Sequence, residues 1–131
     1  MINLDYKERL GYHSDRISAW NIQGVFKSNQ KIDRSKFESS LLAIQNAHPR
    51  LQIYIAKHLG IPRFFKSEAP IPVDFDTYEG KEQLLAIEKQ DMKIQFSLRQ
   101  KPMLYFRIVN GKTFSYMIVT ISHLIADGYS I

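Results

Sequence analysis

A short run of residues near the C-terminus has types and a spacing that could do chemistry. It reads Ser-His-Leu-Ile-Ala-Asp-Gly, so that His123 is followed four positions later by Asp127 and then by Gly128. An imidazole titrates near neutral pH, and His123 could therefore act as a general base. A glycine after the aspartate indicates a tight return of the backbone, because glycine adopts φ values closed to other residues. The alternative is structural, with His123 packed in a core and Asp127 capping a helix.

The residues before His123 predict a rigid support for it. Residues 113–122 are apolar at both alternating sets of positions, which is typical of a central strand covered on both faces. The Asn110-Gly111 pair predicts a tight hairpin with positive φ at both turn positions, and residues 103–109 alternate as the partner strand. Since a side chain at the end of a buried strand is held in a fixed pose, this placement favours chemistry at His123.

The remaining elements predict an α/β domain in which a layered mixed sheet packs with helices. Residues 19–27 and 51–57 have strand patterns, and residues 63–65 complete a hairpin with the second of these strands. Residues 69–76 contain two prolines and are expected to be extended. Within them, Asp74 and Asp76 alternate as on a solvated edge.

Two helices are expected between these strands. The first begins after Asp33 as its N-cap and ends before Pro49, and its buried face is expected to hold Phe37, Leu41, Ile44 and His48. The second begins after Gly80, and one of its faces is expected to hold either Leu84, Ile87 and Asp91 or Leu85 and Met92.

Composition narrows the class of protein. A length of 131 residues predicts one domain over residues 1–131, and 44% hydrophobic with 24% charged residues argues against disorder. The absence of cysteine excludes disulfide scaffolds, thiolate metal sites and cysteine nucleophiles, and it fits a reducing compartment. The sequence has neither a visible signal peptide nor an apolar run long enough for a bilayer. We therefore expect a cytoplasmic protein that does not contact a membrane.

The net charge of +5 raises the question of an anionic partner. The basic residues are scattered, however, and the densest group, at residues 31–36, also contains an aspartate. A mixed-charge solvated surface is the preferred interpretation, so we expect no nucleic-acid partner, and an anionic cofactor or acidic protein partner is the alternative. Because no histidine or carboxylate pair has metal spacing within one element, we also expect no metal site.

At His123, Asp127 and Gly128 the sequence resembles the chloramphenicol-acetyltransferase-like acyltransferases, whose signature is His-x-x-x-Asp-Gly after a strand. It is most similar to the condensation domains of nonribosomal peptide synthetases. The resemblance continues along nearly the whole chain, in a first strand, a first helix, the segment that closes that helix and the segment before the hairpin. These correspond in order to residues 21–26, 32–42, 47–51 and 96–104.

The resemblance implies a function and a role for each residue of the motif. Such enzymes transfer an acyl group from a phosphopantetheine thioester, carried by CoA or a carrier protein, to an amine or hydroxyl acceptor, with no permanently bound cofactor. His123 would be the catalytic residue, Asp127 would pair with an arginine inside the protein, and Gly128 would permit the turn. Ser122 would line the substrate channel, at the position where condensation domains usually carry a first histidine.

The sequence departs from the family pattern at two positions where the family has arginine, which are Ala47 and Gln52. The arginine that pairs with Asp127 could then be Arg50, Arg16 or Arg107. The family's two-lobed proteins are about three times as long as this chain, so the resemblance implies the first part of an N-terminal lobe.

Such a part is expected to lack activity alone, to need the rest of the domain as its partner, and to self-associate through exposed apolar surface. The rival interpretation is a non-catalytic interaction fragment that keeps the fold.

Overall fold

The structure is a computed structural model that describes residues 2–4, 6–17, 19 and 21–125. It contains a four-stranded sheet with the strand order β2-β7-β6-β5 and a smaller sheet with the order β1-β4-β3. The large sheet consists of β2 (Asn21–Ser28), β5 (Val73–Thr77), β6 (Leu104–Asn110) and β7 (Ser115–Ser122). The small sheet consists of β1 (Ile2–Asn3), β3 (Ile53–His58) and β4 (Ile61–Lys66).

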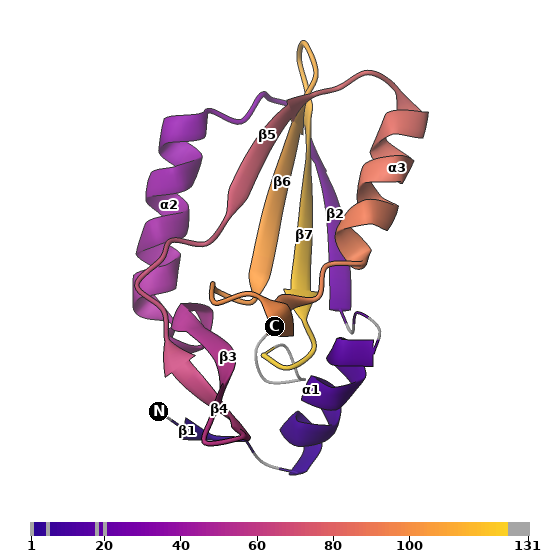
Figure 1. The fold of residues 1–131 in the computed structure, drawn as a ribbon. Coiled ribbons are helices and arrows are strands. Elements are labelled where there is room, and N and C mark those ends of the chain that lie inside the picture. The colour runs from indigo at the N-terminus through magenta and orange to yellow at the C-terminus, as the bar shows by residue number, and fades with distance from the viewer. Residues whose placement is uncertain (1, 5, 18, 20, 126–131) are drawn as a thin grey trace.

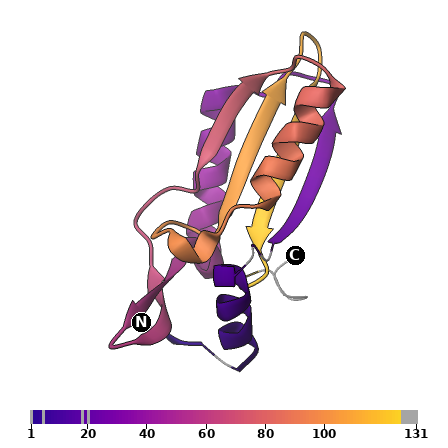
Figure 2. The same ribbon diagram turned by 45° about the vertical axis from the view of Figure 1, so that its right-hand side comes forward.

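Three α-helices accompany the sheets. They are α1 (Tyr6–Ile17), α2 (Arg34–Ala47) and α3 (Lys81–Met92), and short 3₁₀ helices follow at Pro49–Gln52 and Phe96–Leu98. α2 and α3 lie on opposite faces of the large sheet, while α1 and the small sheet lie beyond its lower end (Figures 1 and 2). β5 runs parallel to β6 and the other neighbours are antiparallel, which confirms the predicted α/β architecture with a mixed sheet.

The strand that precedes His123 is central, as predicted. β7 pairs with β2 on one side and with β6 on the other. On one face of the sheet, Leu84 and Ile87 of α3 form a core cluster with Val109 and Ile118. On the opposite face, the ring of Phe37 from α2 packs edge-on against the rings of β5 and β6 at Phe75 and Phe106. β7 is therefore supported from both sides by neighbouring strands and is covered by α3 on one face.

The buried face of α2 differs from the prediction. Asp33 caps the helix as expected, because its carboxylate accepts a hydrogen bond from the Lys36 N–H (3.0 Å). Ile44, however, is 49% exposed, and Gln45 is buried instead. The Gln45 amide bonds to three backbone groups of neighbouring segments, and a polar side chain can be buried at low cost when its groups are paired in this way.

The hairpin between β6 and β7 is confirmed, but its predicted turn is wrong. Asn110 pairs with Ser115, so four residues connect the strands, and neither Asn110 nor Gly111 has a positive φ. A side chain at Gly111 would displace the Phe114 ring, because a Cβ at this position would lie 2.3 Å from it. A second boundary also differs: residues 51–52 belong to the 3₁₀ helix Pro49–Gln52, and β3 begins at Ile53.

The larger core cluster lies where the end of the large sheet meets α1 and the small sheet. Its members come from all three regions and include Leu4, Tyr12, Ile55, Phe64, Phe96, Met103, Leu124 and Ile125. The residues that follow β7 therefore enter the densest part of the core. Among the described helices, none has the length and apolar character needed to span a bilayer.

Candidate functional site

The end of β7 is held by three hydrogen bonds of one residue. The Ser122 N–H donates to the Met103 carbonyl oxygen (3.0 Å), and the Ser122 carbonyl oxygen accepts from the Ile125 N–H (3.1 Å). The Ser122 hydroxyl oxygen accepts from the Leu124 N–H (3.2 Å). The chain therefore turns immediately after β7 with these backbone groups paired, and His123 lies within that turn.

His123 is half-buried and lies between buried neighbours. Ser122 has no exposed surface, and Leu124 and Ile125 are members of the large core cluster. Because the residues on both sides are locked into the core, the backbone of His123 has little freedom to move. A positioned acid–base group needs this kind of support, since its reach is only about 2.6–3.2 Å.

Ser122 acts in this structure as a fixing point for the turn. Its side chain is fully buried and its hydroxyl holds the Leu124 N–H, so the burial gives no support to a place in a substrate channel. That role stays a prediction. Asp127 and Gly128 lie outside the described residues, and their predicted roles also stay predictions.

Two of the three arginines that were named as possible partners of Asp127 can be described. Arg107 is already engaged by two carboxylates, because its guanidinium donates to Asp91 (2.8 and 3.0 Å) and to Asp76 (2.8 Å). Arg50 is exposed near the end of α2. Asp127 lies outside the described residues, so its arginine partner stays a prediction.

The densest group of charges lies around Arg107, in the middle of the sheet face covered by α3. Arg107 bridges β6 to Asp76 on β5 and to Asp91 on α3, and the Tyr105 hydroxyl donates to the Asp74 carboxylate. Asp74, Asp91, Tyr105 and Arg107 border a pocket of about 480 Å³. The hydrogen bonds that Arg107 donates to the Asp91 carboxylate raise the pKa of Arg107, and burial together with the hydrogen bond to Asp74 raises the pKa of Tyr105.

The expectation that Asp74 and Asp76 lie on a solvated edge is met in part, because β5 is an edge strand and Asp74 is exposed, but both carboxylates are bonded to side chains of β6. In the register of β5 and β6, Asp74 lies opposite Arg107, so the two aspartates share a face with Tyr105 and Arg107. The sequence signal that could have revealed this is the matching alternation of charges on two adjacent strands. Since each charge is paired within the chain, we interpret the cluster as a structural link between β5, β6 and α3.

Asn21 is a second polar residue that the sequence patterns did not single out. It lies opposite Ser122 on β2, and its amide nitrogen donates to the carbonyls of Met92 (3.0 Å) and Ile94 (2.7 Å). These bonds tie the start of β2 to the end of α3. The site at the end of β7 is thus braced on the α3 side as well as by the core.

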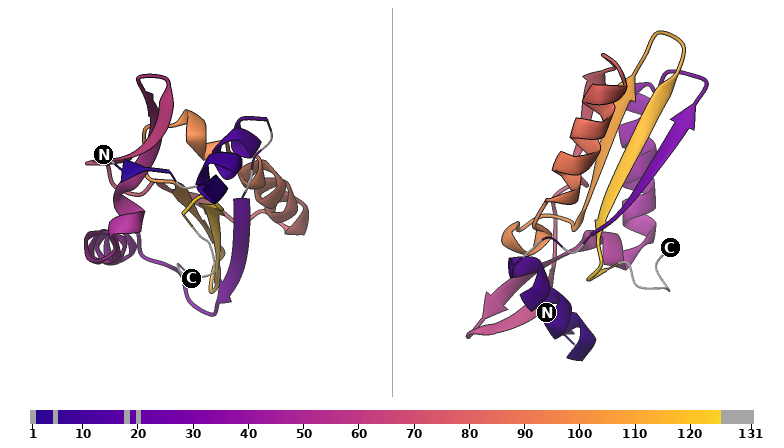
Figure 3. Two further views of the ribbon diagram at one scale, coloured as in Figure 1. Left: turned by 90° about the horizontal axis from the view of Figure 1, so that it is seen from below. Right: turned by 90° about the vertical axis from the view of Figure 1, so that its right-hand side faces the viewer.

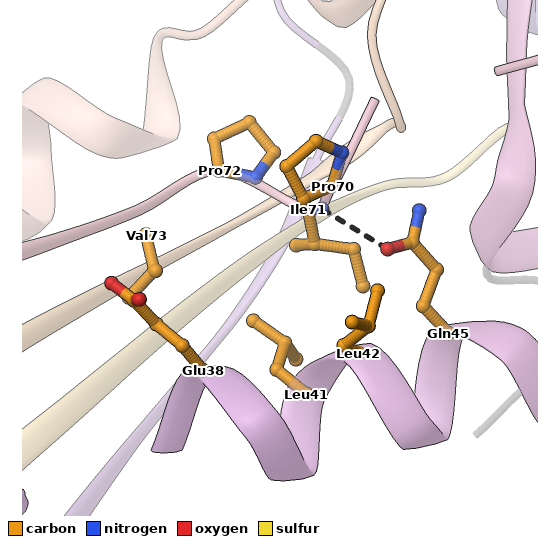
Figure 4. Close-up of a pocket in the computed structure, with 8 residues that line it drawn as sticks. All are labelled: Glu38, Leu41, Leu42, Gln45, Pro70, Ile71, Pro72 and Val73. Carbon is orange, nitrogen blue, oxygen red and sulfur yellow. Dashed lines mark hydrogen bonds between the residues drawn. The ribbon is translucent and has the colours of Figure 1, made fainter. Parts of the chain in front are cut away.

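A separate groove of about 390 Å³ lies between α2 and the segment that leads into β5 (Figure 4). Leu41, Leu42 and Gln45 of α2 face Pro70 and Ile71 across it, and the Ile71 N–H donates to the Gln45 side-chain oxygen (3.3 Å). The groove is mainly apolar, and Glu38 is the one ionisable residue among those that line it. It does not extend the site at His123, because none of the residues around the end of β7 lines it.

Comparisons with solved structures show which proteins share this fold. The starter condensation domain of rhizomide synthetase RzmA superposes with a TM-score of 0.83 at 13% identity, over 98% of this chain and 33% of that chain. The epimerization domain from the third module of tyrocidine synthetase B has a TM-score of 0.75 at 16% identity, over 93% of this chain and 30% of that chain. The X-domain from teicoplanin biosynthesis has a TM-score of 0.79 at 10% identity, over 93% and 28%.

The chain spans about a third of the length of these solved domains. A comparison with curated proteins finds no match. The sequence model of the condensation domain family matches residues 10–131, which is nearly the whole chain. Together with the shared fold, this match shows that the chain belongs to the condensation domain family.

Proposed function

We propose that this chain contributes His123 to an acyl transfer reaction of the condensation-domain type. The donor is the thioester of a phosphopantetheine group, on CoA or on a carrier protein, and the acceptor is an amine or a hydroxyl. The observation that carries the proposal is the place of His123, in a turn fixed by Ser122 at the end of the central strand. The family supplies the reaction class.

The related solved structures support the choice of donor. The starter condensation domain of rhizomide synthetase has been solved, as a mutant, in complex with C8-CoA, and another mutant has been solved with C8-CoA and Leu-SNAC. Both ligands are thioester-type molecules of the kind that the proposed reaction uses. The same chemistry in this chain would need no resident cofactor.

The proposed reaction moves one proton from the acceptor to the departing thiol, and an imidazole can carry it. The acceptor nitrogen or oxygen forms a bond to the thioester carbonyl carbon, and the imidazole of His123 takes the proton that the acceptor loses. The carbon–sulfur bond then breaks, and the proton ends on the departing thiol. Two states of one histidine are enough for this cycle, because imidazole gains and loses a proton near neutral pH.

We place the complete active site in a longer assembly than these 131 residues. Positioning of substrate can lower a barrier by several kcal/mol, roughly 7–11 in the best intramolecular cases, and it needs contacts from all sides of the reacting groups. This chain spans about a third of the solved domains that it resembles. The second candidate function is a non-catalytic interaction segment, and the short length of the chain favours it. An activity assay distinguishes this candidate from the catalytic one.

An acyl transfer assay tests the proposal. A complete condensation domain that contains this segment is mixed with an acyl-CoA or an acyl carrier protein and an amine acceptor, and the acylated product is measured by mass spectrometry. His123→Ala should remove most of the turnover, whereas His58→Ala, which changes an exposed histidine on β3, should not.

The 131-residue chain alone should form no product. Product formation by the short chain would contradict the requirement for a longer assembly. An unaffected His123→Ala domain would contradict the catalytic role of His123 and would favour the interaction segment.

A further inference from the structure

The two edges of the large sheet are built differently. At the β5 edge, Asp74 and Asp76 are bonded to side chains of β6, and the prolines at 70 and 72 precede the strand. Charged side chains and prolines protect a sheet edge against pairing with another chain. At the other edge, β2 has eight residues without a proline, and its one charged residue is Lys27. In the described part of the chain no strand pairs with the outer side of β2.

The exposed edge of β2 also carries apolar side chains. Phe26 is 57% exposed and Val25 is 40% exposed. Ile22 and Phe26 continue the half-buried apolar face formed on β7 by Met117, Val119 and Ile121. α2 lies on that side of the sheet but next to β5, away from β2 (Figure 3). The β2 edge thus combines unpaired backbone groups with exposed apolar surface, and an added strand would satisfy both.

We propose that two copies of this chain pair through β2, antiparallel to each other, about a two-fold axis that passes through Gly24. The two four-stranded sheets would then form one continuous sheet. A second copy is a suitable occupant because β2 is self-complementary in this arrangement. With Gly24 at the axis, Ile22 lies opposite Phe26 of the second copy, and Gln23 lies opposite Val25.

The charges on β2 favour the antiparallel arrangement. Lys27 of each copy lies opposite Asn21 of the other, at opposite ends of the shared strand pair. A parallel pair would instead place the two ammonium groups side by side, and like charges directly opposite each other are destabilising. Apolar cross-strand pairs such as Ile22 with Phe26 each contribute about 0.2–1 kcal/mol.

The packing of Phe26 selects the register. A symmetric antiparallel pair requires that a residue faces its own copy, so the axis lies at Gly24 or at Val25. The Phe26 ring lies over Gly24 of its own strand, since a Cβ there would be 2.9 Å from it. An axis at Val25 would bring a second phenylalanine ring to the same space. An axis at Gly24 keeps the two rings apart.

Salt gives the dimer a distinctive signature. Each chain carries a net charge of +5, so the two copies repel each other over the whole surface. Added salt screens that repulsion, because the Debye length falls from about 10 Å at 0.1 M to about 3 Å at 1 M. A dimer built on backbone pairing and apolar contact should therefore tighten as salt rises, whereas association through opposite charges would weaken.

Sedimentation velocity of the 131-residue chain from low to high micromolar concentration tests the proposal. We expect a reversible dimer, and Val25→Lys should raise its dissociation constant at least tenfold. Leu85→Lys makes the same change at an exposed position on α3 and should leave the dimer intact. Circular dichroism establishes that both variants fold. A monomer at high micromolar concentration, or a dimer that Val25→Lys leaves unchanged, would overturn the proposal.

The register is tested by cross-linking, since the natural chain has no cysteine. Gln23→Cys and Val25→Cys chains are mixed and oxidised, and the axis at Gly24 predicts a disulfide between the two variants. Opposite residues in an antiparallel pair have Cα atoms about 4.5–5.5 Å apart, which suits a disulfide. A disulfide between two Val25→Cys chains in preference to the mixed product would overturn the register, and the absence of both products would overturn the β2 pairing.

Discussion

Two polar regions of the large sheet differ in how their groups are held. Around Arg107, three charged side chains from β5, β6 and α3 are paired with one another beside a pocket. At the end of β7, His123 is held through its main chain, by the hydrogen bonds of Ser122 and the burial of Leu124 and Ile125. The first arrangement pairs charged side chains with one another, and the second fixes the main chain on both sides of His123.

The comparison teaches that shifted ionisation and a cavity are not sufficient signs of an active site. The pKa values of Arg107 and Tyr105 are raised, but both shifts favour the protonated forms that these groups already have at neutral pH. Neither group can then exchange protons during a reaction near pH 7. Imidazole is the side-chain group whose ordinary pKa lies near neutral pH.

The largest expected effect is on catalysis. In a complete condensation domain, His123→Ala should lower the turnover by about 10²–10⁴-fold, which is the usual contribution of a positioned acid–base group. The free energy of unfolding of the 131-residue chain should change by no more than about 1 kcal/mol, as is usual for partly exposed positions. Product formation and urea unfolding measure the two quantities. A large loss of stability with unchanged turnover would show that His123 has a structural role and not a catalytic one.

The next effect is on stability, at Arg107. Arg107→Met should lower the free energy of unfolding by about 3–5 kcal/mol, because it leaves the buried Asp91 carboxylate without its cationic partner. The side chain of Asp91 is 2% exposed, so water cannot replace the lost contact. Urea unfolding measures the loss. The double change Arg107→Met with Asp91→Leu should recover much of it, and a double variant as unstable as the single one would contradict this explanation.

A smaller effect depends on pH. Because the pKa of Tyr105 is raised in the folded state, its contribution to stability is complete below about pH 10 and is lost as the pH rises above that value. Tyr105→Phe should cost about 1.5–3 kcal/mol at neutral pH, where the hydroxyl bonds the Asp74 carboxylate.

Unfolding by urea at a series of pH values checks this. The difference in the free energy of unfolding between the natural chain and Tyr105→Phe should narrow above pH 10, and a difference that stays constant would contradict the explanation.

The smallest effect is at Ser122. Ser122→Ala removes the acceptor of the Leu124 N–H and should lower the free energy of unfolding by about 1–3 kcal/mol. Turnover of the complete domain should fall by less than tenfold, since the other two hydrogen bonds of the turn come from the backbone of residue 122. A loss of turnover as large as that of His123→Ala would show that the serine hydroxyl takes part in the reaction.

The sequence was sufficient to predict the helices and strands whose apolar residues are regularly spaced. The alternation of residues 103–122 predicted the β6–β7 hairpin, and of the two faces predicted for α3 the one with Leu84, Ile87 and Asp91 is buried. Gln45 shows why other features escaped prediction. Its burial depends on backbone partners in neighbouring segments, and periodicity within one element carries no information about such partners.

The candidate site was predictable only in part. The motif and its place after a central strand pointed to His123, and the structure shows the strand and the turn that hold it. The fixing role of Ser122 was not predictable, because it depends on a hydroxyl that caps a turn inside the core. The two carboxylate partners of Arg107 were not predictable either, because they lie on β5 and α3.

The pairing of β2 with β7 has a consequence for the order in which the protein is made. Asn21 pairs with Ser122, so β2, the first strand of the large sheet, cannot pair with β7 until almost the last described residues have been synthesised. Such long-range pairing makes folding slow and leaves earlier strands exposed in the meantime. On the ribosome, β7 arrives between two strands that are already present and joins them. His123 emerges immediately after that strand, so the proposed base takes its position only after the strands that support it have been made.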